Sequence, residues 1–265
     1  MITLIGHGYV GDHIKQELDK QGVKYTWITH NDAIPKDTTV IINAAGYTGS
    51  PNVDACEKER QQTIDGNVIF PLELEHSVGD IPVVHISSGC VYTGYKNGDW
   101  TEYDEPNFDF NNGSFYSGTK TLAQRLLIPF LNKSYLLRIR MPFGDYDHPK
   151  NLLSKLVKYN KLINFENSLS YVNDVASVAV HFATTLPTPG IYNVCNPGSK
   201  TTKQIADMMG LTKQWFTEQE FNEFVTAPRS NCVLSTAKLD QIYPLKSADE
   251  TLSLAISKMN SKLLV

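Results

Sequence analysis

The chain has 265 residues, 41% of them hydrophobic, and its 24 basic and 28 acidic residues give a formal net charge of -4. That length fits one large α/β domain, or a domain with a small annex, whose core needs no disulfide or metal to fold. The mixed, mildly acidic charge excludes the basic surface that grips a nucleic-acid backbone. No apolar run approaches the roughly 18 residues that span a bilayer, so we expect no membrane segment.

The first residues and the cysteines favour a cytoplasmic protein. Residues 1–5 lack the basic start and long apolar run of a signal peptide, so they are expected to form a strand. The cysteines, Cys56, Cys90, Cys195 and Cys232, are far apart and include no CxxC pair. This spacing predicts reduced thiols, rather than disulfides or a zinc site, and no bound metal.

Short apolar runs alternate with helical patterns in the first half, which is typical of a parallel sheet wrapped by helices. We expect strands at 2–5, 23–28, 40–42, 81–87 and 135–139, and helices at 10–18, at 53–76 and from residue 115. Only the residues 29–39 separate the second strand from the third. A parallel crossover normally needs a helix and more residues, so we expect a bare loop there.

The second half of the chain is less regular. We expect helices at 152–159 and 172–182, a strand at 191–194, and broken helical patches over 201–265. The predicted fold class is therefore α/β: a Rossmann-type doubly wound parallel sheet with a small C-terminal substrate-binding subdomain. The dinucleotide-binding domain is assigned to residues 1–142 plus 170–194, and the subdomain to 143–169 plus 195–265.

A glycine-rich motif follows the first strand directly and opens a helix. Gly6-His7-Gly8-Tyr9-Val10-Gly11 reads GxGxxG, and this context is typical of dinucleotide binding. Gly6 permits the tight turn, Gly8 lets the backbone approach a pyrophosphate, and Gly11 allows close helix–strand packing. The helix N-terminus offers amide donors to the phosphates. We expect cofactor contacts from Gly6, Gly8, Tyr9, Val10 and Gly11, with a turn that binds no ligand as the alternative.

The end of the second strand bears on the choice between NAD and NADP. An acid that binds the adenosine ribose is usual there, but the chain has Thr29-His30-Asn31-Asp32, with Asp32 beyond the strand end and no nearby arginine. His30 and Asn31 can donate to a 2′-phosphate, or they can be solvated turn residues. We therefore expect NADPH rather than NADH, on this slight basis.

A tyrosine and a lysine stand four residues apart in Tyr116-Ser117-Gly118-Thr119-Lys120. Residues at this spacing share a helix face, and a nearby cation favours the tyrosine anion and lowers the pKa of the phenol. The pair can then pass a proton to a carbonyl oxygen as hydride reaches the carbon. Ser88 ends the fourth strand, at the edge where such sheets bind ligands, and is expected to hydrogen-bond that carbonyl. The alternative is that the hydroxyl merely ends a strand.

Together with Asn43-Ala44-Ala45-Gly46, these residues resemble the extended short-chain dehydrogenase/reductases, which act mostly on nucleotide sugars. The resemblance implies cofactor contacts from Ala44, Ala45, Gly46, Asn67, Tyr116 and Lys120. It departs from the family in one place: a single residue, His7, separates the first two glycines where the family usually has two. A homodimer is common in the family, but the sequence does not show one.

Longer strings narrow the resemblance. The segments 43–57, 114–117, 137–142 and 227–231 are similar to bifunctional UDP-4-keto-6-deoxyglucose 3,5-epimerase/4-reductases, also found as the C-terminal half of plant rhamnose synthases. The resemblance implies that Cys90 and Lys155 serve 3,5-epimerisation, and that NADPH-dependent 4-reduction then gives UDP-L-rhamnose. An upstream 4,6-dehydratase would supply the substrate. The family has threonine where this chain has Ser88, so the hydroxyl is retained.

Substrate contacts are expected from Ser88, Gly89 and Cys90 at the sugar, and from Asn151 and Arg229 near the diphosphate. A guanidinium matches phosphate geometry, although a surface ion pair is the alternative for Arg229. Cys90 as a buried apolar residue is the alternative to a base. We also expect His148 to be a surface loop residue and the acidic loop 99–109 to be a solvated flap.

Three alternatives to the bifunctional UDP-sugar enzyme stay open. One is a dTDP-4-dehydrorhamnose reductase-type enzyme without epimerase activity, against which Cys90 and Lys155 argue. Another is a dTDP-linked rather than a UDP-linked substrate, since no residue discriminates between the bases. The third is a non-catalytic cofactor-binding regulatory subunit, although such proteins often lose the tyrosine or lysine and this chain has both Tyr116 and Lys120.

Overall fold

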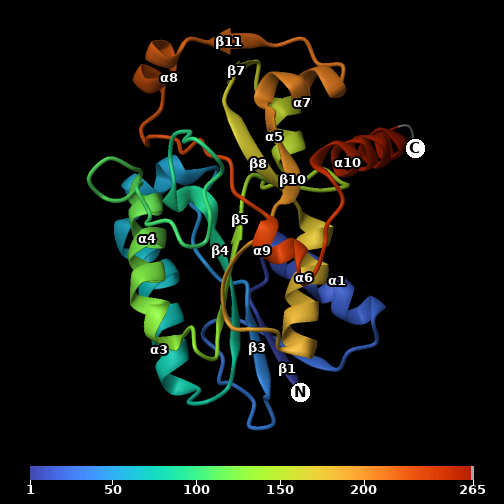
Figure 1. The fold of residues 1–265 in the computed structure, drawn as a ribbon. Coiled ribbons are helices and arrows are strands. Elements are labelled where there is room, and N and C mark those ends of the chain that lie inside the picture. Colours follow the sequence, from blue (N-terminus) through green and yellow to red (C-terminus); the bar gives the residue numbers. More distant parts are fainter. Residues whose placement is uncertain (264–265) are drawn as a thin grey trace.

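A computed structural model describes residues 1–263, and its main layer is a six-stranded sheet with helices on both faces (Figure 1). Every neighbouring pair of strands in this sheet is parallel. The spatial order is β2 (Tyr25–Ile28), β1 (Ile2–Ile5), β3 (Val40–Asn43), β4 (Val83–Ser88), β5 (Tyr135–Ile139) and β9 (Gly190–Asn193). The predicted α/β class with a doubly wound parallel sheet is confirmed.

Helices cover both faces of the sheet (Figure 1). One face carries α1 (Tyr9–Lys20) and α6 (Val172–Thr185), and the other carries α3 (Phe70–Ser77) and α4 (Phe115–Leu127). Ile14 and Leu18 of α1 lie one turn apart and are fully buried, as are Val178 and Phe182 of α6. This period of about four residues aims one apolar stripe of each helix at the sheet, which is what fixes the two layers together.

The strand order reverses between β1 and β3. From β1 the chain moves outward to β2 and then passes β1 to reach β3 through residues 29–39, which form no helix or strand. The predicted bare loop is confirmed, and β2 stays half-buried along its length while β1 and β3 are fully buried. The carboxyl ends of β1 and β3 lie side by side, since the Ala44 N–H donates to the Ile5 carbonyl at 2.9 Å. Ligands of open α/β sheets bind at such a switch point.

The predicted continuous helix over 53–76 is wrong. The chain there forms a 3₁₀ turn η1 (Val53–Glu57), α2 (Arg60–Ile64), a π-helical turn η2 (Asp65–Ile69) and α3. In η2 the Asn67 amide bonds both backbone groups of Tyr47, at 2.9 and 2.8 Å. A hydrophobic pattern does not reveal this π-helical turn, because the turn holds Asn67 against the distant loop that contains Tyr47. Such π turns often occur at functional sites.

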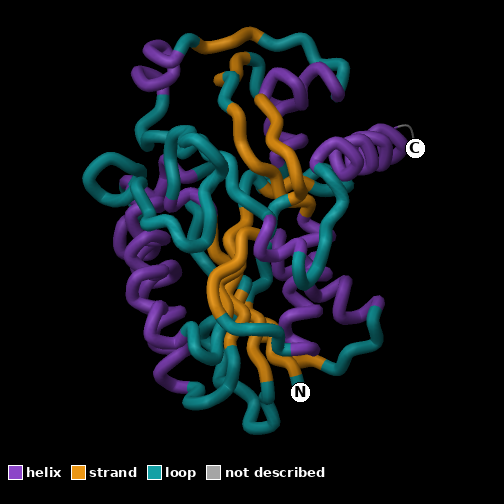
Figure 2. The backbone as a smooth tube through the Cα atoms, viewed as in Figure 1, coloured by secondary structure: helices purple, strands orange, loops and turns teal. Residues whose placement is uncertain are grey.

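A second group of elements lies beyond the carboxyl ends of the main sheet (Figure 2). β6 (Pro142–Phe143), β8 (Glu166–Tyr171) and β10 (Asn196–Thr201) form a three-stranded sheet, and β7 (Lys161–Ile163) pairs with β11 (Gln214–Phe216). The helices here are α5 (Leu152–Lys158), α7 (Thr202–Met208), α8 (Glu218–Phe224) and α10 (Ala248–Leu263), whereas α9 (Ala237–Asp240) packs against β9 and the core of the main sheet. Short 3₁₀ turns are η3 (Gly89–Val91) and η4 (Ile128–Phe130).

These elements have a hydrophobic core of their own, to which Leu153 and Leu156 of α5 and Leu252 of α10 contribute. They fall largely within the residues assigned to a substrate-binding subdomain, and the division into two domains stays a prediction. Within residues 1–263, no helix combines the length and the apolar character needed to cross a bilayer.

The glycine-rich turn gives a test of close packing. A Cβ atom on Gly11 would lie 2.1 Å from the Gly6 carbonyl oxygen, whereas one on Gly8 would meet nothing within 4 Å. Because the backbone must shift to admit it, Gly11→Ala is expected to lower the free energy of unfolding by about 2–4 kcal/mol. Gly8→Ala is the matched control and should change it by less than about 1 kcal/mol. Urea denaturation measures both, and equal losses would contradict the packing argument.

Candidate functional site

The glycine-rich turn joins β1 to α1 at the switch point. Gly6 has a φ of +106°, and a Cβ there would lie 2.6 Å from the Ala45 nitrogen. Gly8 caps α1, a helix of twelve residues, and has open space on the side where a Cβ would stand. The N-terminus of such a helix, approached without a side chain in the way, fits a diphosphate. The structure therefore has room for the predicted dinucleotide at this turn.

The side chain of Tyr9 does not face this open space. Its ring is buried, stacks on His148 with centroids 4.4 Å apart, and meets His13 edge-on at 4.8 Å. A Cβ on Gly144 would lie 2.5 Å from the Tyr9 hydroxyl oxygen, so the phenol points away from the turn. The side chain of Val10 likewise packs against the core, so the predicted cofactor contacts of Tyr9 and Val10 would come from their backbone amides. His148, expected on the surface, is half-buried in this aromatic cluster.

The residues that follow β2 are exposed. The Asp32 carboxylate accepts hydrogen bonds from the Thr29 N–H at 2.7 Å and the Thr29 hydroxyl at 2.6 Å, which hold the pKa of Asp32 below its usual value. Asp32 thus closes the turn instead of reaching outward. The His30 ring meets Phe70 edge-on at 5.6 Å, and Asn31 is exposed beside it. This leaves two polar side chains at the strand end where a ribose phosphate is expected.

A buried chain of hydrogen bonds holds the segment after β3. The Ala45 N–H donates to the Asn43 side chain at 3.0 Å, Asn43 bonds His85 at 3.1 Å, and His85 bonds Glu75 at 3.0 Å. Lys133 lies 2.9 Å from the other carboxylate oxygen of Glu75. Because a buried carboxylate is costly without partners, this chain fixes the backbone at the switch point firmly. No motif in the sequence predicted this chain of hydrogen bonds, although a histidine inside the apolar strand β4 was a visible signal.

Asn67 joins the loop after β3 to helix α4. Besides its two bonds to Tyr47, its amide donates to the Thr119 hydroxyl at 3.2 Å. A Cβ on Gly46 would lie 3.2 Å from the Asn67 oxygen and 3.4 Å from the Lys120 ammonium. A small cavity of about 20 Å³ lies beside Asn67 and Lys120. The predicted cofactor residues Gly46, Asn67 and Lys120 are therefore adjacent in space.

Tyr116, Lys120 and Ser88 meet at the carboxyl end of β4. The Lys120 ammonium lies 5.7 Å from the centre of the Tyr116 ring. Burial raises the pKa of the Tyr116 phenol, Cys90 adds to the rise, and a hydrogen bond with Ser88 opposes it. The expected lowering of the Tyr116 pKa by Lys120 is wrong, because desolvation dominates. Burial also lowers the pKa of Lys120, to about 8.

Cys90 lies in the turn η3, two residues after Ser88. Its N–H donates to the Ser88 hydroxyl oxygen at 3.1 Å, which caps the turn. The Arg140 guanidinium donates to the Cys90 sulfur at 2.9 Å, and Arg140 is 3% exposed. The sequence analysis did not assign Arg140 to the site. It stands 50 residues from Cys90, and its neighbourhood is visible only in three dimensions.

Lys155 is a half-buried lysine on α5. Burial lowers its pKa to about 8, and the positive charges of Lys150 and Arg229 lower it further. Within residues 1–263 no hydrogen bond or ion pair engages its ammonium group. A lysine of this kind exchanges a proton readily near neutral pH. No hydrogen bond among residues 1–263 links Lys155 to Cys90, and the joint role of the two residues in epimerisation stays a prediction.

Asn151 is a capping residue of α5 and is fully buried. Its side-chain oxygen accepts from the Leu153 N–H at 3.0 Å and the Gly144 N–H at 3.2 Å. Its amide donates to the carbonyls of Gly144 at 3.0 Å and Tyr146 at 2.7 Å. The expected substrate contact of Asn151 is therefore wrong, since all of its hydrogen-bonding capacity holds the turn before α5.

Arg229 forms a two-pronged ion pair with Asp54 of η1, at 2.9 and 2.7 Å. Although burial raises the pKa of Asp54, Arg229 and the Ala227 N–H bring it below its usual value. The ion-pair alternative thus describes Arg229 here, and a diphosphate would have to compete with Asp54 for the guanidinium. The pair ties the segment before Ser230 to the 3₁₀ turn after the third strand.

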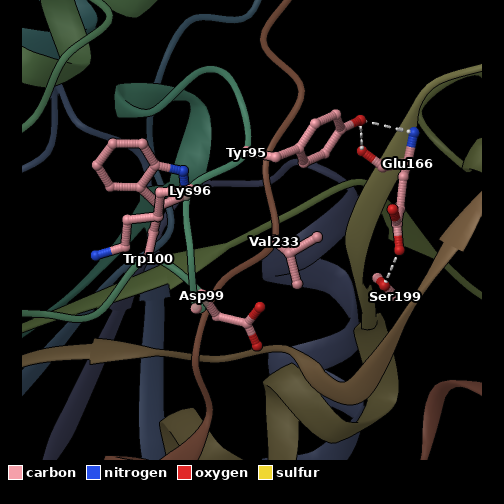
Figure 3. Close-up of a pocket in the computed structure, with 8 residues that line it drawn as sticks. Tyr95, Lys96, Asp99, Trp100, Glu166, Ser199 and Val233 are labelled. Atoms are coloured by element: carbon pink, nitrogen blue, oxygen red, sulfur yellow. Dashed lines mark hydrogen bonds between the residues drawn. The ribbon is translucent and has the colours of Figure 1, made fainter.

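A separate cavity of about 220 Å³ lies near the acidic loop (Figure 3). The Tyr95 hydroxyl donates to the Glu166 carbonyl at 2.9 Å and closes one side of it. Its lining residues are Tyr95, Lys96, Gly98, Asp99, Trp100, Glu166, Ser199 and Val233. None of them belongs to the predicted catalytic set. The acidic loop 99–109 is not a solvated flap throughout, because Glu102 is buried and accepts from the Asn193 N–H at 2.8 Å.

A parallel sheet with a glycine-rich turn at its switch point, and a tyrosine–lysine pair at the end of a neighbouring strand, is typical of dinucleotide-dependent reductases. Residues 3–259 match the family model described as the RmlD substrate binding domain, and the chain belongs to that family.

Three relatives are similar to this chain in sequence or fold over nearly its whole length. A bifunctional dTDP-4-dehydrorhamnose 3,5-epimerase/dTDP-4-dehydrorhamnose reductase of Arabidopsis thaliana is 31% identical, over 96% of this chain and 91% of its own length. The L780 UDP-rhamnose synthase from Acanthamoeba polyphaga mimivirus superposes with a TM-score of 0.88 at 25% identity, covering 98% of this chain and 99% of its own. The dTDP-4-dehydrorhamnose reductase of Bacillus anthracis in complex with NADP, with a TM-score of 0.80 at 18% identity over 98% of each chain, shares the fold.

The Arg229–Asp54 pair gives a test. Arg229→Gln and Asp54→Asn are each expected to lower the free energy of unfolding by about 1–3 kcal/mol, because each leaves a partly buried charge or amide without its partner. The double variant should lose less than the two single losses added together. Urea denaturation of the three variants measures this coupling. If Arg229→Gln alone raised the KM for a nucleotide sugar about tenfold, the guanidinium would serve the diphosphate instead.

Proposed function

We propose that the protein converts a UDP-linked 4-keto-6-deoxyglucose to UDP-L-rhamnose, by 3,5-epimerisation and NADPH-dependent reduction at C4. The observation that carries this proposal is the meeting of the Tyr116 phenol, the Ser88 hydroxyl and the Cys90 thiol at one strand end. The relatives support it through their activities, since the Arabidopsis protein is named for both reactions and the mimivirus protein for UDP-rhamnose. The cofactor of the Bacillus anthracis protein supports NADP(H).

The reductive step uses Ser88, Tyr116 and Lys120. Bound NADPH supplies a hydride to C4 of the sugar. The Ser88 hydroxyl and the Tyr116 phenol hydrogen-bond the C4 oxygen, and Tyr116 gives that oxygen its proton. Because burial raises the pKa of Tyr116, the phenol stays protonated at neutral pH and is ready to act as an acid. Lys120 then stabilises the tyrosinate that remains.

The epimerisation steps use the ketone as an electron sink. The C4 carbonyl acidifies the protons on C3 and C5, and the Cys90 sulfur takes each proton while the C–H electron pair becomes part of an enolate. An acid on the opposite face returns a proton with inverted configuration, and we assign this role to Lys155. Its pKa of about 8 keeps it mostly protonated at neutral pH while making it a better acid than an ordinary lysine. Between steps the Cys90 thiol releases its proton to solvent, and Lys155 takes up a proton from solvent.

A second candidate function is the reduction of a substrate that has already been epimerised. Ser88, Tyr116 and Lys120 suffice for it. The likeness in fold to the dTDP-4-dehydrorhamnose reductase of Bacillus anthracis supports this alternative. The two functions differ in whether solvent hydrogen enters C3 and C5.

The first test follows solvent hydrogen. Wild type, Cys90→Ala and Tyr116→Phe are incubated with UDP-4-keto-6-deoxyglucose and NADPH in deuterated water, and the sugars are read by NMR. Wild type should give UDP-rhamnose with deuterium at C3 and C5. Cys90→Ala should lose the labelling because it lacks the base, and Tyr116→Phe should label the ketosugar while reducing it about 10²–10⁴-fold more slowly.

The control for Cys90→Ala is Cys195→Ala, a buried thiol that the mechanism does not use and whose removal should leave the labelling intact. Cys90→Ala should also still reduce a substrate that has already been epimerised. If wild type reduces C4 without labelling either carbon, the epimerase part of the proposal fails and the reductase remains.

The role of Lys155 predicts a pH dependence. A general acid must be protonated, so deuterium exchange at C3 and C5 should fall as the pH rises through about 8. Lys155→Met should lose exchange at every pH, whereas the reduction of an already epimerised substrate should lack this alkaline limb. Lys158→Met, an exposed lysine on the same helix, is the matched control and should behave as wild type. An exchange rate in wild type that stays flat across this range would exclude Lys155 as the acid.

A further inference from the structure

Arg140 is a buried cation without a carboxylate partner. It is 3% exposed, and no carboxylate among residues 1–263 lies within ion-pair distance of its guanidinium. Buried charges are normally paired, because an uncompensated charge in a low-dielectric interior is costly. The N–H groups of Arg140 instead meet an amide oxygen, a backbone carbonyl and the thiol of Cys90. The structure must therefore supply a counter-charge in some other form.

Three fixed contacts hold the guanidinium in one orientation. Nε donates to the Asn167 side-chain oxygen at 3.1 Å, and Nη2 donates to the same oxygen and to the Ser230 carbonyl, the latter at 2.6 Å. The backbone N–H of Arg140 donates to the Ser170 hydroxyl at 2.9 Å. Nη1 makes none of these contacts and donates to the Cys90 sulfur at 2.9 Å. The guanidinium is thus anchored at one end and presents the other end to the thiol.

The Asn167 side chain, which holds the guanidinium, is itself held in place. The Asn167 oxygen also accepts from the Cys232 N–H at 3.1 Å, and Asn167 is 5% exposed. Asn167 belongs to β8 of the second sheet, whereas Cys90 follows β4 of the main sheet. Arg140 therefore connects the two sheets, and the position of the Cys90 sulfur depends on both.

Two of the groups that meet the guanidinium can become anions, the thiols of Cys90 and Cys232, and of these two only Cys90 is partly exposed. A thiolate accepts a stronger, charge-assisted bond from a guanidinium than a thiol does, and the thiolate is the form that takes a proton from carbon. The other titratable groups that face Cys90 are Tyr116 and Lys120 of α4, and Cys232. Cys232 is fully buried, so substrate does not reach it.

We propose that Arg140 is the positioning residue of Cys90, and that its guanidinium is the counter-charge which keeps the sulfur in the thiolate form at the carboxyl end of β4. In epimerisation the proton moves from C3 or C5 to this sulfur, the electron pair of the C–H bond enters the enolate, and Arg140 keeps all its protons. The catalytic meaning of this assignment rests on the proposed function, but the state of the sulfur is measurable without turnover.

The test is the alkylation of Cys90 by iodoacetamide, followed on its peptide by mass spectrometry over a range of pH. In Arg140→Met the rate at neutral pH should fall about tenfold below that of wild type, and the rates should converge at alkaline pH, where every thiol is ionised. Arg140→Lys keeps the charge but has no planar fork, so it should restore part of the neutral rate.

Arg138→Met is the matched control. Arg138 is fully buried two residues earlier on β5, and its guanidinium bonds Gln124 at 3.0 Å and Asn193 at 3.3 Å. Its loss should destabilise the fold and leave the pH profile of Cys90 alkylation unchanged in the folded fraction. Identical alkylation profiles in wild type and Arg140→Met would overturn the proposal.

A second measurement needs no change at Arg140. The ultraviolet thiolate absorbance of wild type, minus that of Cys90→Ala, should show a thiolate at neutral pH, and its absence would overturn the proposal. Deuterium exchange at C3 and C5 should fall in Arg140→Met, with the reduction of an already epimerised substrate kept within about threefold. If wild type exchanges no deuterium, the proposed epimerisation fails, while alkylation and absorbance still decide the role of Arg140.

Discussion

The site depends on how closely the ends of β1 and β3 approach each other. Gly6 sits against the Ala44–Ala45 backbone, Gly11 sits against the Gly6 carbonyl, and neither position admits a side chain without a shift of the backbone. On the other side of the same segment, the buried side chains of Asn43 and His85 hydrogen-bond each other, which offsets the cost of removing these polar groups from water. This contact places the helix N-terminus, the loop after β3 and the end of β4 around one open edge, where the remaining groups of the site are added.

Two different electrostatic environments then share that edge. On the side of α4, burial keeps the Tyr116 phenol neutral and lowers the pKa of Lys120. On the side of the second sheet, Arg140 brings a fixed positive charge to Cys90. In the proposed function Tyr116 is an acid and Cys90 is a base, and such a pair needs unlike surroundings, because otherwise the two groups would neutralise each other. The fold supplies the difference by drawing one side from the main sheet and the other from the junction with the second sheet.

The sequence predicted the features that local pattern controls. The strands of the main sheet, the helix after GxGxxG, the bare loop over 29–39 and the start of α4 follow from periodicity, glycine placement and chain length, whereas the short strands of the second half were not predicted. It did not predict what depends on distant partners. Asn151 and Arg229 look like ligands in sequence, and only their contacts with Gly144 and Asp54 reveal structural roles. Arg140 was missed for the same reason, since its partner Cys90 stands in the turn after a different strand, β4. The pKa of Tyr116 was misjudged because helix spacing says nothing about desolvation.

The bare crossover after β2 has a consequence for dynamics. Because this crossover contains no helix, β2 is a half-buried edge strand beside the fully buried β1. Strands with little packing open at lower free energy than the core, so amide hydrogens of β2 should exchange faster than those of β1 and β3. A dinucleotide that binds only the folded switch point slows this opening by mass action. The rate of amide hydrogen exchange in β2 is therefore expected to fall when the cofactor is bound.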